Sequence, residues 1–360
     1  MTDFVLWIDT PGTAGDPRLG GKFGSLAEMT EAGFQVPLGF GITTDAYRHF
    51  LDGSGLAEHA RRTRERAAGA DLATVERLAD EMAQAISEAA LPADLETAIR
   101  TAYTDLSAKA GDDEVPVAVR SSGESEDLGG ASFAGQYDTF LWVRGIQDVL
   151  THVRRCWAGM FGSAVLTYRP TRTADLTDYG ICVGIQQMVA SRSAGVMFTL
   201  DPVTGDRSKV VIEGCWGLGE GVVSGAITPS RYVIDKVTFE EVSADVVDQE
   251  QMFALDPSTS VTGLMDVLPS RRAKPCLSAE EIRALVELAK RIEKHRGAPQ
   301  DIEWAIAENG DIRVLQVRPE TVWSNRATEQ LVAAPATAIS QVLARFAGVG
   351  VTRSSGAAGA

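Results

Sequence analysis

Apolar residues recur at helical spacing in several stretches of the chain. Residues 56–110 are almost free of glycine, and their apolar side chains stand three or four positions apart, at Leu72, Val75, Leu78, Met82 and Ile86. Pro92 is typical of a helix start, so a further helix is predicted over residues 93–110. A long amphipathic helix is predicted over residues 277–296, where Ser278 and Glu281 have the spacing of a capping box.

Short apolar runs bounded by turn residues predict strands in much of the remaining sequence. These runs cover residues 115–120, 140–143, 181–189, 195–199, 210–213 and 232–235. A hairpin over residues 301–307 and 312–317 is expected to turn at Asn309-Gly310, a strong turn signal. Residues 147–168 are expected to be helical. Near the N-terminus, residues 19–22 are expected to form a tight, flexible turn before a helix from Ser25 that ends at Gly33.

Length and composition add limits to this picture. The chain has 360 residues, enough for two lobes at roughly 150 residues per domain. Its net charge of −15 argues against a broad nucleic-acid or membrane surface, since such surfaces need clustered Lys and Arg. A phosphate site remains possible, because a few cations and backbone N–H groups are enough to form one.

No targeting or redox signal stands out in the sequence. No apolar run approaches the ~20 residues that span a bilayer, and the N-terminus lacks the layout of a signal peptide, so a cytoplasmic protein is expected. The four cysteines are widely spaced and fit neither a zinc site nor a disulfide framework. We expect them to be reduced and mostly buried; they are Cys156, Cys182, Cys215 and Cys276.

Two segments near glycines could meet phosphate. Gly20-Gly21-Lys22 places an amine beside unshielded backbone, although Phe23 follows the lysine and the P-loop spacing fails, so a surface turn with a solvated lysine is the simpler interpretation. Arg120 leaves a predicted strand and is followed by a loop of small residues over 129–136, which would suit a mobile flap over a polyphosphate. A flexible surface loop explains the same composition.

Two later segments have the residue types of a nucleotide and metal site. The strand that contains Gln186, Met188 and Val189 could pair its backbone with an adenine edge, or it could simply be core sheet. In the predicted hairpin, strand alternation places Asp301 with Glu303 on one face and Gln316 with Arg318 on one face of the partner strand. Their oxygens are ligands that Mg²⁺ takes, but a surface hairpin with a cross-strand ion pair is an equally good interpretation.

Taken together and in order, these segments closely resemble the ATP-binding domain of phosphoenolpyruvate synthase, pyruvate phosphate dikinase and rifampin phosphotransferase. The resemblance runs from about Leu19 to Arg318. It includes the segments that contain Lys22, Arg120, 133–136, 195–199, 201–205, 216–220, 301–304 and 315–319. It implies an α+β, ATP-grasp-like fold with nucleotide between two lobes, here assigned to residues 1–185 and 186–323, with a linker or tail over 324–360.

The resemblance also implies roles for single residues. Lys22, Arg120 and Arg318 would be the catalytic residues and would contact the phosphates of ATP. The flap would close over them through Gly130, Ser132 and Gly135. Gln186, Met188 and Val189 would line the adenine side, Glu303 and Gln316 would hold Mg²⁺, and Asp301 would lie near the ribose or metal. Glu213 and Glu220 are placed in the same lobe without a firm role.

Full-length dikinases of this kind carry a swivelling domain with a phosphorylatable histidine in a Gly-Gly-x-Thr-Ser-His setting. None of the four histidines here has that setting; they are His49, His59, His152 and His295. We therefore expect a second subunit that carries the phosphohistidine and the acceptor site. Split aryl dikinases such as phenylphosphate synthase, which act on aromatic alcohols, fit this expectation. Part of a phosphoenolpyruvate synthase, part of a rifampin phosphotransferase and a nucleotide-binding regulatory protein without turnover are the alternatives.

Overall fold

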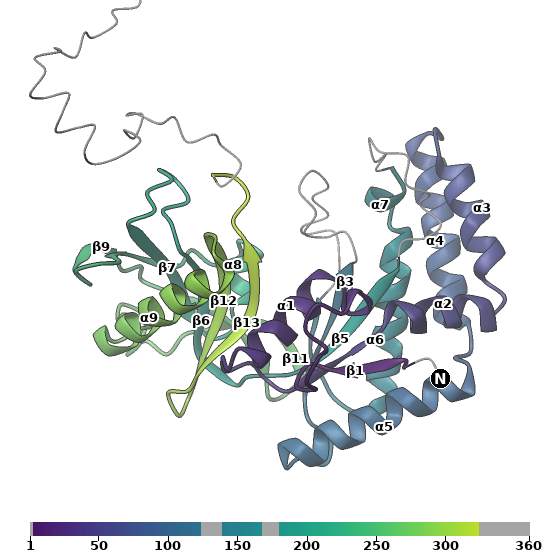
Figure 1. Ribbon diagram of the computed structural model, residues 1–360, viewed down its shortest axis with the longest axis horizontal. Helices are drawn as coiled ribbons and strands as arrows, with labels where there is room; N and C mark the ends of the chain where they lie inside the picture. The colour runs from purple at the N-terminus through teal and green to yellow at the C-terminus, as the bar shows by residue number, and fades with distance from the viewer. Residues whose placement is uncertain (1–2, 124–138, 168–179, 324–360) are drawn as a thin grey trace, which may run out of the picture. The chain divides into compact units, whose positions relative to one another are not determined.

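Two antiparallel sheets form the framework of the protein in the computed structural model, which describes residues 3–123, 139–167 and 180–323. Sheet A has the strand order β1-β2-β5-β3-β4, and sheet B has the order β13-β12-β6-β7-β8-β9 (Figure 1). The strands of sheet A are β1 (Val5–Trp7), β2 (Gly39–Ile42), β3 (Val117–Gly123), β4 (Thr139–Val143) and β5 (Ile181–Gln187). Those of sheet B are β6 (Ser191–Phe198), β7 (Lys209–Trp216), β8 (Ser230–Asp235), β9 (Glu241–Asp245), β12 (Gln300–Ala307) and β13 (Ile312–Pro319).

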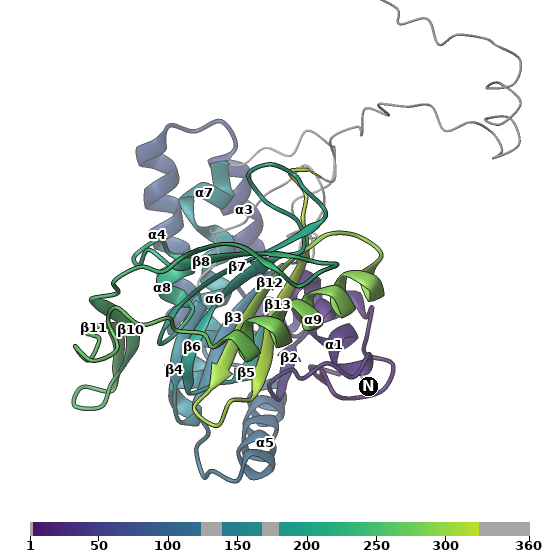
Figure 2. The ribbon, with the colours of Figure 1, turned by 90° about the vertical axis from the view of Figure 1, so that its left-hand side faces the viewer.

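Helices surround sheet A, and one long helix covers a face of sheet B. The helices near sheet A are α2 (Thr44–Gly53), α3 (Ala57–Ala67), α4 (Leu72–Glu88), α5 (Ala93–Ala110), α6 (Ile146–Ala158) and α7 (Ser163–Thr167). Sheet B packs against α9 (Ala279–Arg296), and the short α8 (Glu220–Val223) follows β7. Figure 2 shows α9 lying along sheet B, with a hairpin of β10 (Gln251–Asp256) and β11 (Val261–Asp266) projecting to one side.

Sheet A has two unlike faces because large and small residues alternate along its strands. Val117, Val119, Val183 and Ile185 are buried in one core with α2, α5 and α6. The neighbouring positions on the strands are Ala118, Arg120, Cys182, Gly184 and Gln186, and they point the other way. The side chains on this second face are therefore either small or polar. Their small size leaves room for another helix and for a cavity.

Helix α1 (Gly20–Glu31) occupies part of this second face and joins the two lobes. Phe23 packs over Gly184, where a Cβ atom would stand 1.7 Å from the phenyl ring, so only glycine fits. Further along the helix, Met29 is buried in the core of sheet B with Trp304 and α9. The Ser25 hydroxyl also donates a hydrogen bond to the Val317 carbonyl of β13 at 2.7 Å. Helix α1 therefore packs against both sheets.

The predictions for the long helices and the hairpin are confirmed. Helix α5 begins directly after Pro92, and α9 has the full capping box of Ser278 with Glu281. The predicted hairpin is β12 and β13, with Gly310 at φ 87° in the turn. The α+β class is confirmed by the two sheets and their helices.

Three local predictions were wrong or incomplete. Residues 19–22 are not a flexible turn: a 3₁₀ turn (Pro17–Leu19) leads directly into α1, with Lys22 in its first turn. Residues 147–168 do not form one helix, because α6 ends at Ala158 and a 3₁₀ turn (Gly159–Phe161) separates it from α7. Seven further elements were not predicted, namely β1, β2, β9, β10, β11, α2 and α8.

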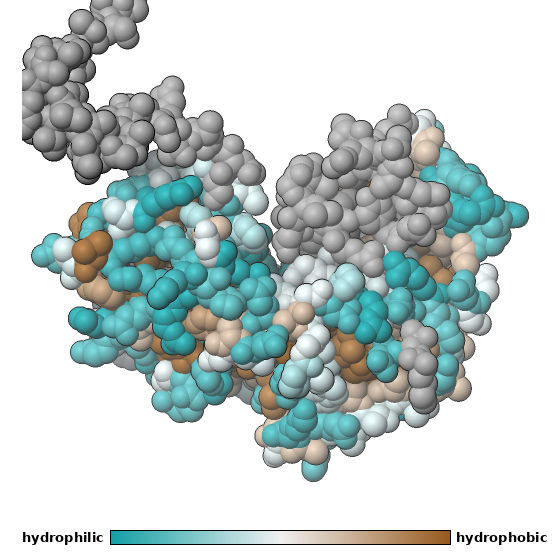
Figure 3. Space-filling view, viewed as in Figure 1, coloured by the Kyte–Doolittle hydropathy of each residue, from teal (hydrophilic) through white to brown (hydrophobic). Residues whose placement is uncertain are grey.

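The cysteines and the surface agree with the composition. All four cysteines are buried with free thiols, and burial raises the pKa of Cys215 and Cys276 to about 12. Within the described ranges, no helix is both long enough and apolar enough to cross a membrane. Figure 3 shows a largely hydrophilic face with hydrophobic side chains in small, separate patches.

Strand β5 runs through the predicted lobe boundary at residues 185 and 186, and the domain limits remain a proposal.

Candidate functional site

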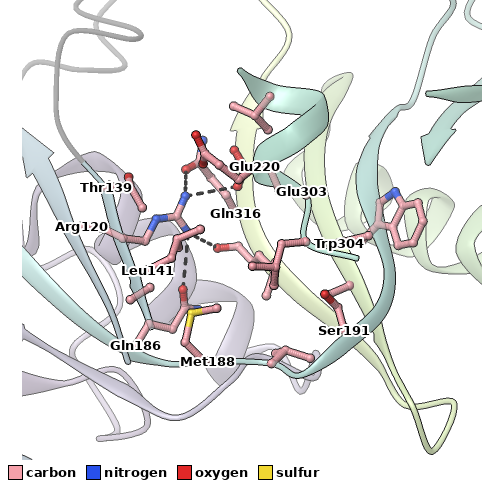
Figure 4. A pocket seen from close by; sticks show the side chains of 18 of the residues that line it. Arg120, Thr139, Leu141, Gln186, Met188, Ser191, Glu220, Glu303, Trp304 and Gln316 are labelled. Atoms are coloured by element: carbon pink, nitrogen blue, oxygen red, sulfur yellow. Dashed lines mark hydrogen bonds and ion pairs between the residues drawn. The ribbon is translucent and has the colours of Figure 1, made fainter. Parts of the chain in front are cut away.

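A cavity of about 570 Å³ lies between the two sheets, in the size range of small-molecule sites. Its walls come from α1, β3, β4, β5, β6, α8, β12 and β13, elements far apart in sequence. Figure 4 shows the side chains that converge there. Eight of the residues predicted for the site line it: Lys22, Arg120, Gln186, Met188, Val189, Glu303, Gln316 and Arg318.

Arg120 crosses from sheet A to sheet B. Its Nη2 donates to Oε1 of Gln316 at 2.7 Å and to Oε2 of Glu303 at 3.2 Å. Its Nη1 donates to the Leu315 carbonyl at 3.0 Å and to Oε1 of Gln186 at 3.4 Å. The arginine side chain is only 11% exposed, so these contacts replace most of its hydration. The guanidinium therefore places a largely buried positive charge in the cavity wall (Figure 4).

A β-bulge in sheet B makes one of these contacts possible. Glu303 pairs with Gln316 and Trp304 pairs with Val314, so Leu315 is an extra residue on β13. A bulge leaves the extra residue outside the ladder and re-aims its neighbours, and such bulges are common beside active sites. Here the Leu315 carbonyl turns to Arg120, while Glu303 and Gln316 remain on the cavity face. Hydrophobic alternation in the sequence gave no sign of the bulge.

The oxygens of Glu303 and Gln316 suit a magnesium ion that also binds phosphate. Mg²⁺ in nucleotide enzymes takes one or two protein oxygens and completes its shell with water and phosphate oxygens. Among residues 3–123, 139–167 and 180–323, no group of three or more His, Cys, Asp or Glu side chains could hold a metal alone. A carboxylate beside an amide oxygen therefore fits a metal that arrives with nucleotide, and does not fit an all-protein metal site.

Two buried donors in the cavity also suit an anionic ligand. Nε of Arg120 and Nε2 of Gln186 are buried, and neither has a hydrogen-bond partner in the described part of the chain. A buried donor without a partner costs roughly 1–3 kcal/mol, so a ligand oxygen at this position would remove a cost that the protein otherwise carries. Both atoms belong to residues that line the cavity.

Asp301 pairs with Arg318, one of the lining residues. It does not line the cavity; its carboxylate pairs with Arg318, at 2.6 Å from Nη2 and 2.7 Å from Nε. Burial raises the pKa of the Asp301 carboxyl, and the charge of Arg318 opposes that rise. The pair is the cross-strand ion pair that the sequence analysis left open. Asp301 thus positions Arg318, and its contact with ribose or metal remains a prediction.

Lys22 reaches the cavity because β3 anchors the start of α1. The Ser122 hydroxyl accepts a hydrogen bond from the Phe23 N–H at 3.2 Å and donates one to the Leu19 carbonyl at 2.8 Å. Leu19 offers no side-chain cap, so Ser122 satisfies a helix N-terminus from another element. The Arg120-Ser121-Ser122 segment therefore supplies the central arginine and also holds the turn of helix that carries Lys22.

The end of β5 and the residues that follow it line the cavity as predicted. The first two backbone N–H groups there already donate hydrogen bonds within the protein. The N–H of Gln187 donates to the Leu38 carbonyl at 2.8 Å, and the N–H of Met188 donates to the Pro116 carbonyl at 2.9 Å. An adenine edge would have to meet the chain beyond these two groups, at Val189. The adenine contact remains a prediction.

Sequence reasoning missed part of the lining. Thr139 and Leu141 of β4 and Ser191 of β6 line the cavity without any motif to signal them. Leu218, Gly219 and Glu220 also line it, and their signal was the Trp216-Gly-Leu-Gly-Glu220 segment, which had no assigned role. Burial raises the pKa of Glu220, the nearby Glu303 raises it further, and Arg120 opposes both. Glu213, by contrast, is not among the lining residues and lies near Arg231, at 3.8 Å from its Nε.

Gly130, Ser132 and Gly135 fall outside the described residues. The four histidines are all described, and none lines the cavity. Three of them make local contacts: His49 with Asp94, His295 with Glu28, and His152 with the ring of Phe140.

Two α+β lobes thus enclose a charged cavity of the size that small ligands occupy. A profile of the family described as "Pyruvate phosphate dikinase, AMP/ATP-binding domain" matches residues 16–337. The chain belongs to this family, and an AMP/ATP-binding domain accounts for most of its length.

Relatives of known name agree with this assignment. A probable phosphoenolpyruvate synthase of Methanothermobacter thermautotrophicus is 41% identical, covering 92% of this chain and 48% of the relative. Phosphoenolpyruvate synthases of Aeropyrum pernix and Pseudomonas aeruginosa are 36% and 37% identical, over 90% of this chain and 43% of each relative. The chain thus spans about half the length of these relatives or less. A solved D-alanyl-alanine synthetase A of Vibrio cholerae aligns at a TM-score of 0.27 and 10% identity, which is too weak to argue from.

Proposed function

We propose that this chain binds Mg·ATP in the cavity and presents its phosphates to a histidine on a partner subunit. ATP, water and the histidine would give AMP, inorganic phosphate and phosphohistidine, with the β-phosphoryl group on the imidazole. The observation that carries the proposal is the convergence of Lys22, Arg120, Glu303, Gln316 and Arg318 on one cavity from separate elements. Family membership and the names of the relatives support it.

The chain's own residues would act by position and charge. Phosphoryl transfer needs aligned reactants and neutralised oxygens more than covalent help from the protein. Lys22 and Arg318 bring cations to the cavity from the start of α1 and from the end of β13, and Arg120 adds a third from β3. A magnesium ion held by Glu303 and Gln316 would neutralise charge on the phosphates and orient them. Asp301 would keep Arg318 directed toward the cavity edge.

The acceptor of the ATP phosphate must come from outside the cavity wall. None of the four histidines is among the lining residues. This supports a histidine outside these residues, which we place on a second subunit that would also carry the site for the final acceptor.

The final acceptor is the finer part of the proposal. The resemblance to split aryl dikinases favours an aromatic alcohol or phenol. A second candidate, synthesis of phosphoenolpyruvate, is favoured by the names of the relatives. The two separate when the chain and its partner are given ATP with either phenol or pyruvate, and the phosphorylated product is identified.

The direct test is formation of AMP by the chain mixed with its partner subunit. Lys22→Ala, Arg120→Ala and Glu303→Ala should each lower the rate at least about a hundredfold, since each removes a charge at the transferring phosphates. Lys209→Ala, which breaks an ion pair with Asp235 away from the cavity, serves as the control and should keep the rate. Near-wild-type turnover in any two of the three cavity variants would sink the assignment.

The same assay separates the rival functions. A regulatory protein would bind ATP, measured by calorimetry, and form neither AMP nor ADP with any partner. An ordinary ATP-grasp ligase would release ADP and need no phosphohistidine. AMP with ³²P on a partner histidine, supplied from β-labelled ATP, is the outcome that the proposal requires.

A further inference from the structure

The place predicted for the metal is next to a cation of the protein itself. Glu303 and Gln316, the two residues with magnesium-type oxygens, both accept hydrogen bonds from Nη2 of Arg120. Figure 4 shows the guanidinium directed at these two side chains, with Glu220 close to the same group. Nη2 of Arg120 thus donates hydrogen bonds to both of the oxygens that are proposed as ligands of a metal ion.

A guanidinium and a divalent cation do not share this position easily. The Arg120 and Glu303 side chains are only 11% and 21% exposed, so water screens the site weakly. Arg120 and a metal bound to the same two side chains would repel each other at short range. Removal of Arg120 alone would in turn leave the half-buried carboxylates of Glu303 and Glu220 without the guanidinium that offsets their mutual repulsion.

We infer that Arg120 is a displaceable internal cation: it occupies the metal position of the nucleotide-free protein and leaves Glu303 and Gln316 only when Mg²⁺ and nucleotide enter together. This rests on the proposed function for the identity of the ligand. The exchange keeps a cation at the carboxylates, because Mg²⁺, with two positive charges, replaces the singly charged guanidinium there. The phosphates, in turn, give the displaced guanidinium new oxygen partners.

The contacts of Arg120 fit such an exchange. Its Nη1 hydrogen bonds go to neutral oxygens, the Leu315 carbonyl and the Gln186 amide, and its Nε has no partner in the described residues. If the Arg120 guanidinium moves toward phosphate, its ion pair with Glu303 breaks and its Nε gains a hydrogen-bond acceptor. A metal ion without nucleotide offers Arg120 no such compensation. Free metal should be excluded, and the metal should enter as its nucleotide complex.

The experiment measures Mn²⁺ binding without nucleotide, using the electron paramagnetic resonance signal of free Mn²⁺. Wild-type protein should bind Mn²⁺ weakly at this site. Arg120→Ala should bind it at least about tenfold more tightly, because a hydrogen bond to a charged group is worth at least one tenfold step in an equilibrium constant. Arg120→Gln, which removes the charge but keeps a polar, though shorter, hydrogen-bonding side chain, should show the same direction and guards against misfolding of the alanine variant.

Two further variants locate the effect. Arg120→Ala combined with Glu303→Gln should lose the added Mn²⁺ affinity, since the carboxylate is gone. Arg192→Ala removes an arginine from another half-buried ion pair, with Glu281, and should bind Mn²⁺ as wild type does. Circular dichroism confirms that each variant is folded.

The outcomes decide the inference separately from the proposed function. Equal Mn²⁺ affinity in wild type and both folded Arg120 variants overturns it, as does added affinity that survives Glu303→Gln. Failure to form AMP with a partner would refute the proposed reaction and leave the metal titration unchanged. Tight Mn²⁺ binding by Arg120→Ala, lost with Glu303→Gln, supports the exchange whatever the final acceptor is.

Discussion

Single residues in the cavity are held in place by partners that no local pattern predicts. The motif around Arg120 was sufficient to predict a cation. The hairpin pattern placed Asp301 with Glu303 on one face and Gln316 with Arg318 on one face of the partner strand, and the structure shows which of them pair. The contact of Arg120 with those oxygens joins residues nearly 200 positions apart. Such a contact depends on how the two sheets face each other, which strand alternation does not encode.

Glu220 carries a prediction at this scale. Its folded pKa is raised by burial and by Glu303, above the ordinary value of 4.5. The folded protein thus binds this proton more tightly than the unfolded chain, so stability falls as the pH rises from 4.5 through the raised pKa. Glu220→Gln removes the cost of this carboxylate. We expect a gain on the order of 1 kcal/mol in unfolding free energy at pH 7, and a smaller gain near pH 4.

Thermal unfolding from pH 4 to pH 8 checks this expectation. Glu241→Gln on the exposed strand β9 is the matched control, and it should show no such pH-dependent gain. A lower melting temperature for Glu220→Gln than for wild type at pH 7 would contradict the argument. Loss of nucleotide affinity in a more stable variant would show that the carboxylate serves the site at a cost to the fold.

At the scale of elements, close contacts between strands and helices explain several glycines. Gly184 admits the ring of Phe23, and Gly195 of β6 lies against the backbone of β7. The glycine of the Gly195-Val-Met-Phe-Thr199 segment was part of the family resemblance, but its reason is packing. Helix caps and the Asn-Gly turn are local, and for that reason they were predicted from the sequence.

The Gly195 contact gives a stability prediction. A Cβ at this position would stand 1.9 Å from the Glu213 carbonyl oxygen, so Gly195→Ala must move two central strands apart. Forced overpacking costs roughly 1–3 kcal/mol, and backbone on both sides puts this site at the upper end. Chemical denaturation should show a loss of at least about 2 kcal/mol.

Gly263→Ala on β11 is the control for that measurement. A Cβ there meets nothing within 4 Å, and the same change should leave stability within about 0.5 kcal/mol of wild type. Equal effects of the two substitutions would mean that the close approach of β6 and β7 does not limit the protein.

For the described molecule as a whole, α1 couples the two lobes. Phe23 belongs to the core beside sheet A, whereas Met29 on the same helix is buried in the core of sheet B. Residues up to Trp323 also form one compact unit. A substitution in α1 should therefore weaken both sheets together.

Met29→Ala tests this coupling. Truncating a fully buried methionine costs about 2–5 kcal/mol, and the loss should reach both lobes because α1 is common to them. Hydrogen exchange read by mass spectrometry should speed up in β5 and in β7 by similar factors. Met82→Ala in α4, equally buried but only in the sheet A core, is the comparison and should affect β5 more than β7. Faster exchange confined to β7 in Met29→Ala would refute the coupling.

The sequence by itself determined the long helices, the hairpin of β12 and β13, the buried cysteines and, through ordered motifs, the family and eight of the residues that line the cavity. These features depend on periodicity, capping and turn chemistry, which act over a few residues. Only the tertiary structure decided that Lys22 sits on a helix anchored by Ser122, that Asp301 holds Arg318, and that a bulge at Leu315 turns a carbonyl to Arg120. Those arrangements arise from the packing of distant segments and their shared charges, so the cavity's chemistry became visible only when both sheets were in place.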